Sequence, residues 1–405
     1  MKLLEGEREQ LAIEILSALA ARLSEGRGDG GSWSDGAAGV AVFYSECERV
    51  RALPGSWAEA SRAHLESAIA ALEAQPLPAG LFGGVAGIAW AVAYVQGDDA
   101  KADDTNELDR ALIASTSDVP YVGPIDLMGG LAGIGVYALE RSSTESGRAL
   151  LQAVVERLSE TCAEGGGWKN DLRWLPPRYR QGRSENEYDV GVAHGAGGVL
   201  PVLSAAMATG VARPLAARAY ERTRDWLLSS CLADEAATFP ALVVPGHAPR
   251  RTRSAWCYGD PGMAATLHAA AVAADDTELA ARALGIAEKA LRRPLPEWGV
   301  VDAGLCHGAA GVAHCYQRLY RRSGRELFRR ATLAWLDVVF ARFRAHGLAG
   351  LRAWDERESP AAWREATGVL EGLAGVGLVL LSALSEAPLG WDRPFALSTR
   401  LEEVS

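Results

Sequence analysis

Residues 372–376 read Gly-Leu-Ala-Gly-Val, and this Gly-x-x-Gly element, followed by small and aliphatic residues, recurs along the whole chain. Its copies begin at Gly36, Gly84, Gly130, Gly195, Gly259, Gly308 and Gly372, at intervals of 46 to 65 residues. An interval near 48 residues is typical of one helical hairpin per repeat, and the longer intervals leave room for loops. The repeats therefore predict seven helical hairpins, each with a helix that starts at a glycine element.

Two kinds of segment alternate between the glycine elements. Residues 88–93 and 376–381 are apolar on nearly every face, which is typical of a helix buried on all sides. Residues 58–74 and 279–290 carry apolar residues along one face only, which indicates outer helices that cover the buried ones. Because β-branched residues are sparse, the sequence predicts an all-α fold with seven inner and seven outer helices.

A row of seven hairpins can form an open solenoid or a closed ring. The last repeat lies close to the end of the sequence, with no polar capping repeat after it, whereas solenoids need such caps for solubility. The inner segments are also more apolar than the concave face of a typical solenoid. We therefore expect an α/α toroid (barrel).

No change in composition marks a domain boundary, so we expect one domain over residues 1–405. Two stretches depart from the hairpin pattern, near 165–188 and 239–253; the second holds Pro240, Pro245 and Pro249. Both lead directly into a glycine element, at Gly195 and Gly259. We expect them to form longer loops on the rim above the helix starts.

Bulk properties exclude several classes of protein. The formal charge of -10 argues against nucleic acid as the main partner. Six cysteines in 405 residues do not make a disulfide framework. The N-terminal stretch is charged and lacks the apolar core of a signal peptide, and no apolar run reaches the roughly 18 residues of a membrane span. We expect a cytoplasmic protein with reduced thiols.

Metal-binding residue types directly precede two of the glycine elements. Cys257 lies in the segment Trp-Cys-Tyr-Gly before one element, and Cys306 and His307 precede the next. In a ring of repeats these equivalent positions converge on one mouth. Two thiolates and one imidazole suit a single Zn²⁺ per chain and leave a fourth position for water or substrate. The alternative is two buried free cysteines and a capping histidine.

A closed site made of Cys306, His307, His314 and Cys315 is a rival ligand set. It fails on distance, because His314 lies roughly 10 Å along a helix from His307 at about 1.5 Å per residue. A zinc–ligand bond is only about 2.0–2.3 Å long. We therefore expect His314 and Cys315 to face the core or a neighbouring helix.

Four further residues occupy positions around these elements. His194 takes the place of His307 in another repeat, as a general acid or base or as a helix cap. Asp126 can orient a histidine, bind substrate or act as an N-cap. Arg253 can stabilise a developing enolate or bind a carboxylate, or be a solvated arginine, and Tyr258 flanks Cys257 on its other side.

A zinc ion with two thiolate ligands is electron-rich and a modest Lewis acid toward water. It is suited to binding a substrate thiol and keeping it as the thiolate. That chemistry favours thiol transfer or thiol addition over peptide hydrolysis. The sequence also lacks the His-Glu-x-x-His pattern of a metalloprotease helix.

The motifs together resemble those of the lanthipeptide cyclase (LanC) family. The resemblance covers nearly the whole chain and is carried by residues 126–133, 193–195, 256–259, 306–308 and 370–375. It implies an α/α toroid with zinc at one end, and the zinc ligands of the family match Cys257, Cys306 and His307. His194 matches the residue proposed to handle the proton in this family. Asp126, Arg253 and Tyr258 match residues that line the site.

The reaction implied by the resemblance is an intramolecular Michael-type addition. A cysteine thiolate of a dehydrated, leader-bearing precursor peptide attacks dehydroalanine or dehydrobutyrine in the same peptide and forms a lanthionine or methyllanthionine thioether ring. A separate dehydratase and a transporter are the partners implied. Two alternatives stay open: addition of glutathione to dehydroamino acids, and a non-catalytic zinc scaffold that binds the peptide. A glycosidase is disfavoured, because Asp35, Asp126 and Glu371 give no clear acid/base pair.

Overall fold

The computed structural model describes residues 2–26, 30–97, 102–175, 180, 182–184, 186–355 and 360–400, apart from the side chains of 102–105. Within this part, the chain forms fourteen α-helices and four short strands. The helices are α1 (Gly6–Ser24), α2 (Ala37–Val50), α3 (Ala58–Ala74), α4 (Val85–Gln96), α5 (Ala102–Ser115), α6 (Leu131–Glu140), α7 (Glu145–Thr161), α8 (Ala196–Thr209), α9 (Arg213–Ser229), α10 (Asp260–Ala273), α11 (Thr277–Ala290), α12 (Ala309–Ser323), α13 (Glu326–His346) and α14 (Leu373–Leu384). The strands are β1 (Tyr188–Asp189), β2 (Leu242–Val243), β3 (Ala353–Asp355) and β4 (Ala362–Arg364).

Contacts between residues divide the chain into two compact units. The first unit consists of residues 1–77, 82–100 and 299–391 and holds α1–α4, α12–α14, β3 and β4. The second consists of residues 78–81, 101–298 and 392–405 and holds α5–α11, β1 and β2. Each unit contains whole helical hairpins, such as α2–α3 in the first and α8–α9 in the second.

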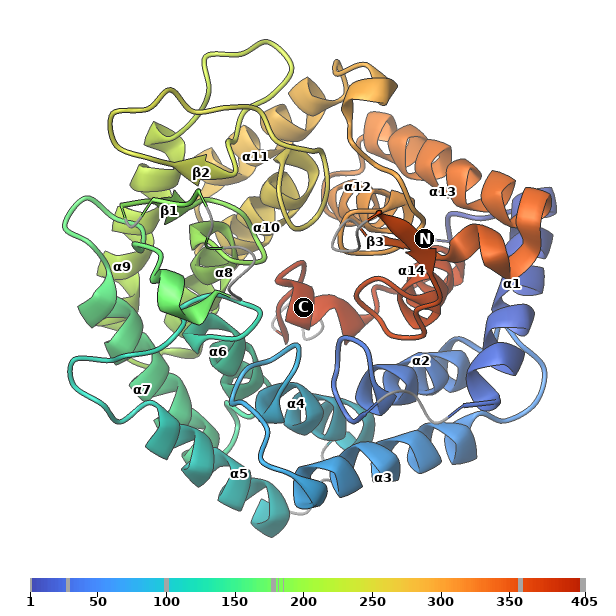
Figure 1. Ribbon diagram of the computed structural model, residues 1–405, viewed down its shortest axis with the longest axis horizontal. Coiled ribbons are helices and arrows are strands. Elements are labelled where there is room, and N and C mark those ends of the chain that lie inside the picture. The colour runs from blue at the N-terminus through green and yellow to red at the C-terminus, as the bar shows by residue number, and fades with distance from the viewer. Residues whose placement is uncertain are drawn as a thin grey trace. The chain divides into compact units, whose positions relative to one another are not determined.

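Inner and outer helices differ in burial as the sequence predicts. The helices α2, α4, α6, α8, α10, α12 and α14 follow the seven glycine elements, and every residue of α14 is buried. The other helices bury one face; in α3 the buried residues are Ser61, His64, Leu65 and Ala68. In Figure 1, α7, α9 and α11 each lie along the buried helix before them, α6, α8 and α10. The predicted alternation of buried and one-sided helices is confirmed.

The first helix of the chain is the outer partner of the last buried helix. α1 packs against α14 and α13 within the first unit, and its buried face includes Ile15, Leu16 and Leu19. Just before it, the backbone N–H groups of Leu3 and Leu4 both donate to the carbonyl of Ala383. α14 also packs against α2. The first and last repeats are therefore neighbours, and α1 supplies the seventh outer helix.

The long loops carry short strands that the sequence pattern does not predict. The loops near 165–188 and 239–253 pair with each other through β1 and β2, with Tyr188 opposite Val243. A bridge between Lys169 and Tyr188 extends this pairing. In the first unit, β3 and β4 form an antiparallel hairpin after α13, with Trp354 opposite Trp363. Residues 176–179, 181 and 185 of the first loop lie outside the described residues.

Candidate metal centre and active site

Folded-back turns precede the buried helices and satisfy their first N–H groups. Before α12, the N–H groups of Ala309, Ala310 and Gly311 donate to the carbonyls of residues 302, 303 and 304. At the starts of α2, α6, α8, α10 and α14, backbone N–H groups likewise donate to the carbonyl of the residue seven positions earlier. These carbonyls replace the side-chain N-cap, which none of these helices has. The turn thus fixes the residues just before each helix, where the candidate site residues lie.

Glycine is required where the turn touches the helix. A Cβ atom on Gly262 or Gly311 would lie under 3.0 Å from a turn carbonyl, that of Trp256 or Leu305, a separation that real Cβ atoms essentially never show. Gly259 meets the same obstacle at Arg253 and also has a φ of +106°, which side chains rarely adopt. The Gly-x-x-Gly repeat is therefore explained by the close approach of this turn to the helix, which leaves no room for a Cβ atom.

His194 and Asp126 form a direct pair in the second unit. Nδ1 of His194, just before α8, lies 2.7 Å from Oδ2 of Asp126, which comes from the turn before α6. The other oxygen, Oδ1, accepts a hydrogen bond from the N–H of Gly129 at 2.8 Å. Asp126 therefore orients a histidine and caps its own turn at the same time. With Nδ1 engaged, Nε2 is the nitrogen of His194 that remains for chemistry.

The environment of His194 favours its protonated form. The surrounding protein tends to lower the pKa of the imidazole, but the charge and hydrogen bond of Asp126 outweigh this and raise it to about 9. Asp189 and Cys257 act in the same direction. The side chain of His194 remains 42 % exposed. At neutral pH it is an imidazolium that can donate a proton.

Asp189 is a site residue that the sequence analysis does not identify. Its carboxylate is buried and accepts hydrogen bonds from the hydroxyl of Tyr258 at 2.8 Å and from the N–H of Gly191 at 3.0 Å. Burial raises the pKa of Asp189 to about 6 despite these donors and the charge of His194. Burial, and then the charge of Asp189, also raise the pKa of Tyr258 well above its usual value. The Tyr258 hydroxyl therefore stays protonated and donates to Asp189.

Hydrogen bonds to other parts of the second unit hold the segment that carries Cys257 in place. The Cys257 carbonyl accepts hydrogen bonds from the N–H groups of Val192 at 2.9 Å and Ala193 at 3.3 Å, directly before His194. Trp256 is fully buried, and its indole N–H donates to the carbonyl of Phe395 at 2.9 Å. The Cys257 side chain is itself buried. Cys257 and His194 thus belong to two turns that are bonded to each other.

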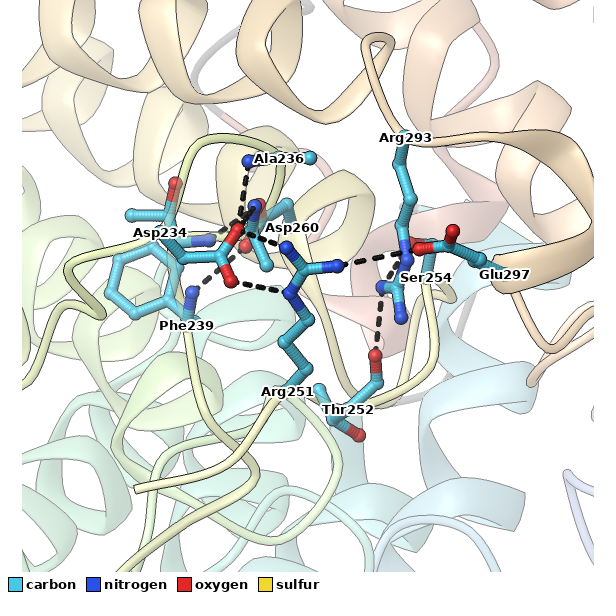
Figure 2. A network of polar contacts seen from close by, with 11 residues as sticks. Asp234, Ala236, Phe239, Arg251, Thr252, Ser254, Asp260, Arg293 and Glu297 are labelled. Atoms are coloured by element: carbon cyan, nitrogen blue, oxygen red, sulfur yellow. Dashed lines mark hydrogen bonds and ion pairs between the residues drawn. The ribbon is translucent and has the colours of Figure 1, made fainter. Parts of the chain in front are cut away.

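A polar network anchors the loop that leads into this segment (Figure 2). The guanidinium of Arg251 pairs with Asp234 and with Glu297, and it lowers the pKa of Asp234 to about 2. Arg293 donates to the carbonyl of Thr252 at 2.8 Å and to the hydroxyl of Ser254 at 2.9 Å. The half-buried Arg253 lies between these anchored residues. The Arg251 side chain thus has a structural use.

Cys306 and His307 belong to the first unit, in the turn before α12. The N–H of Cys306 donates to the carbonyl of Leu370 at 2.8 Å. Nε2 of His307 lies 3.7 Å from Oδ2 of Asp302, which is buried in the same turn. Farther along α12, His314 is buried and stacks on Trp391 with ring centroids 4.7 Å apart. His314 and Cys315 face the core, as expected.

Cys257 in the second unit, and Cys306 and His307 in the first, each offer one ligand atom of a kind that binds metal ions. Two thiol sulfurs and one imidazole are a donor set suited to zinc, which favours sulfur and nitrogen ligands. Three protein ligands leave one tetrahedral position open, as in catalytic rather than structural zinc sites. The residues therefore fit the group that the sequence implies.

Comparison with known proteins assigns the family. Residues 29–396 match the model for lanthionine synthetase C-like proteins, and the chain belongs to this family. Over 336 residues it is 24% identical to the nisin biosynthesis protein NisC of Lactococcus lactis subsp. lactis, a match that covers 75% of this chain and 73% of that protein. The solved structure of nisin cyclase aligns with a TM-score of 0.70 and 19% identity, over 96% of this chain and 97% of that one. The fold is therefore an α/α toroid, as predicted.

Within the described residues, no helix combines the length and the apolar character needed to cross a membrane.

Proposed function

We propose that this chain is a zinc-dependent cyclase that forms lanthionine and methyllanthionine rings in a dehydrated precursor peptide. Family membership supports an enzyme that forms thioether rings. The observation that carries the proposal is the pair of His194 and Asp126, at 2.7 Å, together with the hydrogen bonds that join the turn of His194 to the carbonyl of Cys257. A thiol ligand and a proton donor side by side are what thiol addition to a double bond requires.

Zinc would be held by Cys257, Cys306 and His307. When bound, zinc would lower the pKa of a substrate thiol, so that the thiol would give its proton to solvent and react as a thiolate at neutral pH. The chain then has to position the peptide and supply one proton.

His194 is the proton donor in this proposal. As the substrate sulfur forms its bond to the β-carbon of a dehydroalanine or dehydrobutyrine, the electrons of the double bond move to the α-carbon and its carbonyl. Nε2 of the imidazolium gives its proton to the α-carbon and leaves neutral His194. Asp126 holds Nδ1 and stabilises the charged ring before transfer. Solvent then restores the proton.

Arg253 and Tyr258 complete the proposed site. The guanidinium of Arg253 would stabilise the negative charge that develops on the substrate carbonyl. The ring of Tyr258 is fixed by its hydroxyl bond to Asp189 and by close packing against Gly191, where an added Cβ would collide with the ring. A fixed aromatic wall next to Cys257 would limit how the peptide approaches.

The biological setting follows from the same proposal. The substrate would be a leader-bearing peptide dehydrated by a separate enzyme, with a transporter as a further partner. We propose a single domain over residues 1–405 that acts in the cytoplasm. All six cysteines are free thiols, which fits a reducing compartment.

The test is ring formation in a dehydrated precursor peptide with zinc present. Each ring removes one thiol that N-ethylmaleimide can alkylate and leaves the peptide mass unchanged. The wild-type protein should close rings at least 10²-fold faster than His194→Ala, the range for loss of a general acid. Glutathione added to the mixture should form no covalent adduct with the peptide. Equal rates for wild type and variant would favour a scaffold, and a glutathione mass adduct would favour external thiol addition.

A further inference from the structure

A buried carboxylate lies behind His307. Asp302 is 1 % exposed, and both of its oxygens are bonded to backbone. Oδ1 accepts from the N–H of Gly304 at 3.0 Å, and Oδ2 accepts from the N–H of Trp354, in β3, at 3.0 Å. Oδ2 also lies 3.7 Å from Nε2 of His307. The carboxylate is fixed in place with one side toward the imidazole.

The same local motif occurs in another repeat. Asp189 precedes His194 by five residues, as Asp302 precedes His307, and each aspartate accepts the N–H of the glycine two residues later. The second oxygen of Asp189 accepts a hydrogen bond from the hydroxyl of Tyr258. The second oxygen of Asp302 accepts a hydrogen bond from the backbone N–H of Trp354 and faces His307. The module Asp-x-Gly-x-x-His thus places a buried carboxylate behind each of the two histidines.

We propose that Asp302 is a positioning residue that sets the tautomer of His307. It favours the proton on Nε2 and so leaves Nδ1 as the nitrogen that binds metal. This inference rests on the proposed function, because it assumes that His307 is a zinc ligand.

The physical basis is the charge and the spare capacity of the carboxylate. An ionised carboxylate only accepts hydrogen bonds, and each of its oxygens can accept two; the hydrogen bond from Trp354 uses one position on Oδ2. A protonated Nε2 is attracted to this oxygen, whereas a lone pair on Nε2 is repelled. At 3.7 Å the interaction is longer than a hydrogen bond, so it acts through charge, which is strong in a buried site. Carboxylates that face the second nitrogen of metal-bound histidines commonly fix their tautomer.

Anchoring makes the effect specific. Because both oxygens of Asp302 are tied to backbone, the carboxylate cannot rotate away to water. Its Trp354 bond also connects the turn before α12 to the β3–β4 hairpin. The orientation of His307 therefore depends on a carboxylate whose own position is fixed from two sides.

The affinity test uses zinc alone and compares Asp302→Asn with Asp355→Asn. Asp355 is also a buried carboxylate, but its partner is Arg364. Competition with a chelator should give a zinc dissociation constant 10–100-fold weaker in Asp302→Asn, the usual loss for such partners. In Asp355→Asn it should change less than about threefold, because that carboxylate is not the one facing the metal ligand. Asp302→Glu keeps the charge and should recover part of the loss.

The second measurement needs no variant of Asp302. In zinc-loaded wild-type protein labelled with ¹⁵N-histidine, one of the seven histidines should show a protonated Nε2 and a metal-bound Nδ1, and this signal should be absent from His307→Asn. Binding through Nε2, or an unchanged zinc affinity in Asp302→Asn, would overturn the inference alone. A wild-type protein that binds no zinc would overturn both the inference and the proposed function.

Discussion

Two cysteines in equivalent turns of successive repeats are proposed as zinc ligands, and a third lies in the adjoining helix. Cys306→Ala should remove most of the zinc, because an open three-ligand site cannot lose a thiolate without a large loss of affinity. Cys257→Ala should behave alike. Cys315→Ala, a buried cysteine of α12, is the matched control and should retain about one zinc per chain. Elemental analysis of folded protein, checked by circular dichroism, would decide.

The raised pKa of His194 predicts the pH profile of ring closure. The folded-state value of about 9 exceeds the usual 6.5, so the imidazolium is fully present at neutral pH and is lost as the pH rises through about 9. The rate should fall over that interval. Because Asp126 is the main group that raises the pKa, Asp126→Asn should shift the fall toward lower pH.

Single-turnover rates from pH 6 to pH 10, with zinc saturating, would measure both curves. An Asp126→Asn profile that declines at the same pH as wild type would show that His194 is not the titrating donor. The same sign applies to stability: the contribution of the pair is complete below pH 6.5 and fades as the pH approaches 9.

The sequence indicates the residues that could bind metal, but it does not show which carboxylates contact the site histidines. Cys257, Cys306 and His307 precede glycine elements, so their chemistry and spacing are visible in the chain. The bond between Asp126 and His194 joins residues 68 positions apart, and no periodicity encodes that distance. Asp189 and Asp302 could have been found, because Asp-x-Gly-x-x-His occurs before both histidines. Their roles depend on burial, which a single sequence does not give.

At the scale of the element, the glycines at the helix starts should be intolerant of any side chain. Gly262→Ala in α10 would force a Cβ against the Trp256 carbonyl and should lower the free energy of unfolding by about 1–3 kcal/mol. Gly285→Ala in α11 is the control, because nothing lies within 4 Å of its Cβ. It should raise stability by about 0.4–1 kcal/mol.

Urea unfolding followed by circular dichroism would give both values. A Gly262→Ala protein as stable as wild type would mean that the turn gives way easily and that the Gly-x-x-Gly pattern has another origin. Opposite signs for the two substitutions would separate the cost of contact from the general effect of glycine in helices.

Helices were easier to predict than strands, for a physical reason. The buried helices are 10 to 15 residues long, enough for apolar periodicity to be distinctive, and residues 58–74 coincide with α3. The outer segment 279–290 begins two residues late, because Asp276 caps α11 by accepting the N–H of Leu279. The strands have only two or three residues, too few for an alternating pattern. Which of these strands pair depends on which loops lie side by side in the fold.

At the scale of the whole molecule, the first helix is expected to be as important as any core helix. Leu16→Ala on the buried face of α1 should cost about 2–5 kcal/mol, because it opens a cavity in the unit that holds α14. Arg8→Ala breaks only the half-exposed ion pair with Asp337 and should cost at most about 1 kcal/mol. Thermal denaturation would rank them, and equal melting temperatures would show that α1 is a dispensable cover.

The packing of α1 on α14 has a consequence for synthesis on the ribosome. Most of the second unit is one continuous stretch, 101–298, so it can fold as soon as that stretch has emerged. The first unit needs both early and late residues, and α1 has to wait until residue 384 has been made before its partner exists. At about 5–20 residues per second, its apolar face is exposed for roughly 20 seconds or more. During that interval the exposed apolar face of α1 makes the unfinished chain prone to aggregation.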